Sequence, residues 1–218
     1  MLSIDQNDAR RADNRSQTIT EAGPYEGIIT RAEKLQSEKG SIGLGISFKS
    51  DSGATANYLD LYTHNAKGEK LPSKSIVDAI LCCTRLSEVN EGEIEVEKWD
   101  KEAKENYKTK VDGYPQLMGK KIGFLLQQEL QTNIKTGADV ERVTIYGVFE
   151  SGTNFTASEI LDKATKAEKL EKMIAAVEKN PLIDRRTNKS KQSGSAQTHK
   201  QPSSAPGGFD DFDDDIPF

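Results

Sequence analysis

The chain has 218 residues, with 30 lysine and arginine residues against 35 aspartate and glutamate residues and a formal net charge of −5. This length accommodates one domain of ordinary size with tails and excludes two large domains. The acidic balance argues against a protein that coats nucleic acid through bulk charge alone, although it allows a locally basic groove. No apolar run approaches the roughly 20 residues needed to span a bilayer, and residues 1–6 do not resemble a secretory signal. We therefore expect a cytoplasmic protein without a membrane partner.

Residue types that commonly carry catalysis are scarce. The only cysteines, Cys82 and Cys83, are adjacent, so neither a disulfide framework nor a zinc site with normal ligand spacing is available to them. The only histidines are His64 and His199. We expect no enzyme, no catalytic residue, no cofactor and no metal site, although carboxylates gathered in a cleft by the fold would still permit a metal-dependent hydrolase.

Three segments near the start of the body favour β-strands. Residues 24–32 are rich in β-forming residues, and residues 41–49 alternate with Ile42, Leu44, Ile46 and Phe48 on one face and small or polar residues on the other. Residues 57–63 place Leu59 and Leu61 opposite Tyr58, Asp60 and Tyr62. With a turn at residues 50–53, this pattern predicts an antiparallel meander, whose nearly bare Gly43, Gly45 and Ser47 face would allow a nucleic-acid strand to approach closely.

The remaining elements complete a small β-barrel pattern. A helix is expected from an N-cap at Ser73 to Thr84, two further strands over residues 121–130 and 141–149, and a turn at residues 136–139. Three strands, a helix and two strands is the order of the oligonucleotide-binding (OB) barrel, although other small barrels share it. The fold-class prediction is a mainly β, OB-like, five-stranded antiparallel barrel with an inserted helix. One amphipathic helix over residues 157–179 is expected to pack on the barrel or pair with another copy in a homo-oligomer.

Exposed aromatic rings and cations are what a single-stranded DNA site requires, because bases stack on rings and cations follow the phosphates. Two strand tyrosines satisfy the first need, and the mixed stretch 97–110 supplies rings and lysines on what we expect to be a long loop of the barrel. The candidate DNA-binding residues are Tyr58, Tyr62, Trp99, Tyr107, Lys49, Lys101, Lys104, Lys108 and Lys110. A purely structural interpretation remains open, because strand tyrosines often cover core edges and Lys/Glu runs often form solvated surfaces.

Composition changes sharply after the body. We divide the chain into a flexible arm at residues 1–19, a domain at 20–183, a disordered linker at 184–208 and an acidic tip at 209–218. Residues 184–206 have a net charge of +4, whereas residues 207–218 carry five aspartates and have a net charge of −5. Apolar residues interleave these aspartates, which suits a basic pocket with an apolar slot better than simple solubilisation.

This ending closely resembles the acidic tip of bacterial single-stranded DNA-binding proteins (SSB), in which a run of aspartates precedes Ile-Pro-Phe. In that family the tip recruits replication, recombination and repair enzymes. The resemblance implies that the protein-partner residues are Asp213, Asp214, Asp215, Ile216, Pro217 and Phe218.

The body has a second resemblance, which is carried by residues 23–27, the Lys39-Gly40 turn, and residues 58–62 followed by 68–70. These look similar to a phage family of single-stranded DNA-binding proteins encoded beside recombination and replication genes. Together the two resemblances imply a protein of the bacterial host cytoplasm that protects single-stranded DNA with little sequence preference and recruits enzymes through its tip. The alternatives are an adaptor or inhibitor that occupies host pockets for the SSB tip without binding DNA, or a strand-annealing recombination protein.

Overall fold

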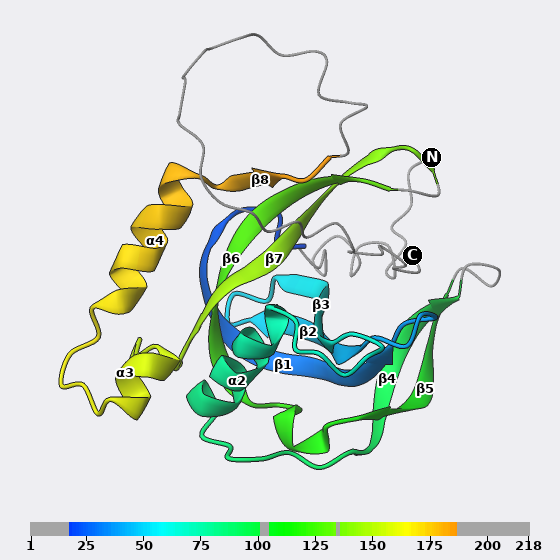
Figure 1. The fold of residues 1–218 in the computed structure, drawn as a ribbon, viewed down its shortest axis with the longest axis horizontal. Coiled ribbons are helices and arrows are strands. Elements are labelled where there is room, and N and C mark those ends of the chain that lie inside the picture. Colours follow the sequence, from blue (N-terminus) through cyan, green and yellow to red (C-terminus); the bar gives the residue numbers. More distant parts are fainter. Residues whose placement is uncertain (1–17, 101–104, 134–135, 187–218) are drawn as a thin grey trace, which may run out of the picture.

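The computed structural model describes residues 18–100, 105–133 and 136–186. In these ranges the protein is mainly β, with eight strands in one sheet and few helices (Figure 1). In chain order the elements are β1 (Gly23–Gln36), β2 (Ile42–Ser50), β3 (Thr55–His64), α2 (Ser73–Cys83), β4 (Gly92–Asp100), β5 (Glu105–Gly113), a 3₁₀ turn η1 (Pro115–Leu117), β6 (Lys121–Thr132), β7 (Asp139–Phe149), α3 (Ala157–Leu161), α4 (Lys169–Lys179) and β8 (Leu182–Asp184).

The long strand β1 organises the sheet by pairing with two partners along its length. Its residues 27–36 pair antiparallel with β2, which pairs antiparallel with β3, so the predicted meander is confirmed. Its first residues, 23–28, pair antiparallel with β6, which pairs antiparallel with β7. The five predicted strands therefore lie in the order β3-β2-β1-β6-β7, and the short β8 adds a parallel pairing to β6.

Apolar side chains from these strands form the core. Leu44, Ile46 and Phe48 of β2 are buried as the alternation predicted, and the Phe48 and Phe124 rings meet edge to face with centroids 5.0 Å apart. Ile42 departs from the pattern at 39% exposure. Helix α2 packs against β3, β7 and α3. The expected N-cap at Ser73 is wrong, because Ser73 is already the first helical residue and Pro72 precedes it at the cap.

The loop expected over residues 97–110 is also wrong, because this stretch contributes to a β-hairpin formed by β4 and β5. Ile94 and Val96 alternate with glutamates on β4 and are buried, which gives the hairpin one apolar face. On the polar face, diagonal ion pairs join β5 to β4: Lys108 contacts Glu95 at 2.9 Å, and Lys110 contacts Glu93 at 2.6 Å. The hairpin stands beside the β1–β3 layer in Figure 1 and is tied to β1 through the Glu33–Gly113 pairing.

The single helix expected over residues 157–179 is divided into α3 and α4. The Glu159 carboxylate explains the division, since it accepts hydrogen bonds from the backbone nitrogens of Thr156, Glu168 and Lys169, at the starts of both helices. Thr156 and Glu159 form the spacing of a capping box, which is a readable signal that the amphipathic pattern concealed.

None of the helices in the described ranges combines the length and apolar character that a membrane crossing requires. The predictions for residues 1–17 of the arm, for residues 187–208 of the linker and for the acidic tip, including residues 213–218, concern residues outside the described ranges. Of the last two arm residues, Thr18 pairs with Thr55 and Ile19 is buried.

Candidate nucleic-acid interface

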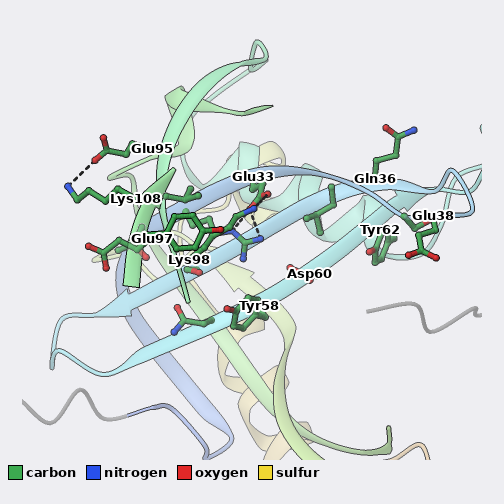
Figure 2. Close-up of a pocket in the computed structure, with 18 residues that line it drawn as sticks. Glu33, Gln36, Glu38, Tyr58, Asp60, Tyr62, Glu95, Glu97, Lys98 and Lys108 are labelled. Atoms are coloured by element: carbon green, nitrogen blue, oxygen red, sulfur yellow. Dashed lines mark hydrogen bonds and ion pairs between the residues drawn. The ribbon is translucent and has the colours of Figure 1, made fainter. Parts of the chain in front are cut away.

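A groove of about 870 Å³ lies between the polar face of β1–β3 and the β4–β5 hairpin (Figure 2). The β1–β2 turn closes one part of it through residues 36–38. Its principal aromatic and charged lining residues are Arg31, Glu33, Glu38, Tyr58, Asp60, Tyr62, Glu95, Glu97, Lys98, Tyr107 and Lys108. The groove thus joins the predicted aromatic strand face to the segment that sequence had suggested as a loop.

Tyr58 is the most exposed ring of the groove, with 62% of its surface accessible. It lies in a β-bulge, where Asn57 and Tyr58 of β3 oppose the single residue Ser47 of β2. Its φ angle of 58° falls in the left-handed region, which is unfavourable for a bulky residue. Such strain is often retained where a side chain is aimed for function, and here it presents the ring beside Arg31, whose guanidinium carbon is 5.5 Å from the ring centroid.

Tyr62 and Asp60 extend the same strand face (Figure 2). Tyr107 contributes a further ring from β5. Tyr107 is 45% exposed. Burial raises the pKa of Asp60, which the nearby Arg31 charge opposes. The Oδ1 atom of Asp60 is buried without a hydrogen-bond partner among the described residues, so this carboxyl is under-satisfied at the groove floor.

The charges of the groove are mixed. Three cationic residues and five carboxylate residues line it, so the lining is acidic overall. The cations are paired: Arg31 and Lys98 both contact Glu33, and Lys108 contacts Glu95. The arrangement therefore combines stacking surfaces with cations that are already neutralised by the protein's own acids.

The glycine face of β2 does not offer the open approach that its sequence suggested. A Cβ on Gly45 would lie 3.0 Å from Arg31 Nη2 and 3.1 Å from Asp60 Oδ1, so side chains of the protein already cover this point. A Cβ on Gly43 would lie 2.6 Å from the Leu61 carbonyl oxygen of the paired strand. These glycines serve the close packing of the protein itself.

The predicted site residues divide into three groups. Tyr58, Tyr62, Tyr107 and Lys108 line the groove together. Lys49 and Lys110 are exposed but do not line it, and Lys110 is paired with Glu93. Trp99 lies on β4 opposite Asn106, but its side chain and all of Lys101 and Lys104 are outside what the structure describes.

Sequence reasoning missed Arg31 and Glu33 and left Lys98 out of the site. A β-bulge explains the first two: Ile29 and Arg31 of β1 pair with the adjacent β2 residues Phe48 and Ser47, so Thr30 is an extra residue. This extra residue reverses the alternation after buried Ile29 and turns Arg31 and Glu33 toward the groove. The Arg-x-Glu spacing, which puts both side chains on one strand face, was the available signal.

In the described ranges, no group of three or more histidine, cysteine, aspartate or glutamate residues is arranged to hold a metal ion. No protein-family model matches the chain, and no curated protein matches it significantly.

Proposed function

We propose that this protein binds single-stranded DNA in the groove between β1–β3 and the β4–β5 hairpin, with little sequence preference. The observation that carries the proposal is the gathering of Tyr58, Tyr62 and Tyr107 around one groove with Arg31, Lys98 and Lys108. Rings of this kind bind bases of any sequence through their π-faces, and cations bind the backbone phosphates.

The strand order supports an OB-type interpretation of the fold. The row β3-β2-β1-β6-β7, with α2 between β3 and β6 in the chain, follows the OB succession, and α2 contacts both end strands. OB domains bind oligonucleotides on the face of their second and third strands. The groove is lined by Ser47 of β2 and by several β3 residues, among them Tyr58 and Tyr62, so this part of its lining agrees with the expectation. The β4–β5 hairpin would then be an insertion that forms a second wall.

We further propose that residues 213–218 recruit replication, recombination or repair proteins, as the resemblance of the ending to the SSB tip implies. The predicted linker, residues 184–208, would raise the effective concentration of the tip near an enzyme on the same DNA. The barrel and the tip would then act as two separate sites.

One observation favours a second candidate function. Because carboxylates outnumber cations in the groove, phosphate attraction is weak there, which suits an adaptor or inhibitor that uses only its tip. The adaptor proposal predicts no DNA binding and no effect of Tyr58 on partner binding.

The deciding experiment titrates the full chain with fluorescein-labelled oligo(dT), following anisotropy, Trp99 emission and a gel shift at low and high salt. The DNA proposal is supported if binding is sensitive to salt and unlabelled single-stranded DNA competes with the labelled oligo(dT) better than duplex DNA does. Absence of binding in all three measurements at low salt overturns it and leaves the adaptor proposal.

A further inference from the structure

Glu33 connects the two walls of the groove. Its Oε2 atom lies 2.7 Å from both Nε and Nη2 of Arg31 on β1, and its Oε1 atom accepts a hydrogen bond of 3.0 Å from Nζ of Lys98 on β4. Only 9% of Glu33 is exposed, whereas 40% of the Lys98 side chain is. Figure 2 shows Glu33 and Lys98 approaching each other from separate strands. One carboxylate therefore uses both oxygens to pair with two groove cations.

The chemistry of this cluster matches a phosphodiester. A backbone phosphate offers two anionic oxygens, and arginine and lysine are the side chains that bind such groups most readily. We propose that Arg31 and Lys98 form a phosphate subsite for the backbone of the bound strand, and that Glu33 occupies this subsite when the strand is absent. This inference rests on the proposed DNA-binding function.

The surroundings indicate that a phosphate can replace the Glu33 carboxylate, which favours an exchangeable anion over a purely structural ion pair. Arg31 lies against the Tyr58 ring, so a base stacked on Tyr58 brings its own phosphate close to the guanidinium. Lys98 has three N–H donors on a partly exposed side chain and uses one of them for Glu33. An incoming phosphate can therefore engage Lys98 before Glu33 leaves.

The inference predicts a change in salt dependence. Each phosphate contact on single strands contributes about −0.7 to the slope of log affinity against log salt. Glu33→Gln removes the single negative charge that Arg31 and Lys98 share, so the net positive charge of the subsite rises by one. The slope should therefore steepen by about 0.7 relative to the wild type, with binding at low salt about tenfold tighter.

Glu97→Gln is the matched control. Glu97 lines the same groove and lies across the hairpin from Lys108, whose ion pair at 2.9 Å is with Glu95. Glu97→Gln therefore makes the same change in net charge while that ion pair remains in place. It should raise affinity slightly and leave the slope unchanged. Lys98→Gln, which keeps the Arg31–Glu33 pair, should flatten the wild-type slope by about 0.7. Glu33→Gln combined with Lys98→Gln leaves one net positive charge, as in the wild type, and should return to about the wild-type slope.

The four variants and the wild type are compared by oligo(dT) anisotropy over a salt series, with thermal unfolding to verify the fold. A steeper slope for Glu33→Gln alone supports the subsite. If the wild type binds but Glu33→Gln and Glu97→Gln have equal slopes, the subsite proposal is overturned and the DNA-binding proposal stands. The same conclusion follows if Glu33→Gln binds more weakly than the wild type. If Glu33→Gln does not fold, an unchanged slope for Lys98→Gln overturns it. Absence of binding by every protein overturns the DNA proposal and the subsite together.

Discussion

The guanidinium carbon of Arg31 lies 5.5 Å from the centroid of the Tyr58 ring, although the two residues come from different strands. If bases stack on this ring, Tyr58→Ala should weaken oligo(dT) binding about tenfold, since one base stack contributes about 1–3 kcal/mol. Tyr58→Phe retains the ring and should bind nearly as the wild type does. Anisotropy titration at fixed salt measures both.

Tyr146→Ala provides the control for that substitution. Tyr146 is 42% exposed on β7 and does not line the groove, so its loss should leave the affinity unchanged. Equal losses from Tyr58→Ala and Tyr146→Ala would contradict the assignment of the groove.

Glu159 should control stability at low pH. Burial alone would raise its pKa, but hydrogen bonds from three backbone nitrogens and the Thr156 hydroxyl outweigh burial and lower the pKa to about 2. Because the folded-state pKa is below the ordinary value of 4.5, the stabilisation is fully present above pH 4.5 and is lost as the pH falls toward 2.

Glu159→Gln should therefore lower the free energy of unfolding by about 2 kcal/mol at neutral pH and reduce its dependence on pH in that window. The exposed Glu178→Gln is the control and should change little. Urea unfolding at several pH values measures this free energy, and parallel pH profiles for the wild type and Glu159→Gln would contradict the prediction.

The two cysteines should differ in reactivity. Cys83 is 3% exposed and burial raises its pKa to about 12, whereas Cys82 is partly exposed and its thiol donates to the Ala157 carbonyl at 3.6 Å. Since the thiolate is the reactive form, iodoacetamide should label Cys82 in the native protein and Cys83 only after unfolding. Peptide mass spectrometry locates the label, and rapid native labelling of Cys83 would show that its environment opens.

Gly27 should not accept a side chain. A Cβ at this position would lie 2.1 Å from the Lys49 carbonyl oxygen and 2.6 Å from the Ser50 Cα atom, both backbone atoms of the paired strand. Gly27→Ala should cost about 2–3 kcal/mol of stability. Gly92→Ala, whose Cβ would meet only the Pro115 ring at 3.1 Å, should cost less than about 1 kcal/mol. Thermal unfolding of both variants gives the comparison, and equal costs would be inconsistent with it.

Removal of residues 210–218 should separate the two proposed sites. If the five aspartates compete with DNA for the groove cations, the shortened chain should bind oligo(dT) more tightly at low salt and lose its protein partners. Anisotropy measures the first effect, and pull-down of SSB-tip-binding enzymes measures the second. Unchanged DNA affinity at low salt would remove the competition between tip and groove.

Local elements with a regular period could be predicted from the sequence alone. Alternation identified the β2 and β3 faces, because a strand repeats every two residues and buried Leu59 and Leu61 place Asp60 and Tyr62 on the other side. Prediction from alternation failed where the local pattern is ambiguous or a bulge interrupts it. Lys/Glu runs suit a loop or a helix as well as the hairpin β4–β5, and the bulge at Thr30 reverses the faces of β1.

The way in which charges and rings meet depends on the tertiary structure. Arg31, Glu33 and Lys98 are brought together because the β4–β5 hairpin lies against β1. Glu33 and Lys98 are 65 residues apart in the sequence, and no local sequence pattern predicts their contact. Sequence could find tyrosines able to stack and lysines able to bind phosphate. Which of them share a groove, and which are neutralised by the protein's own carboxylates, depends on strand pairing between distant segments.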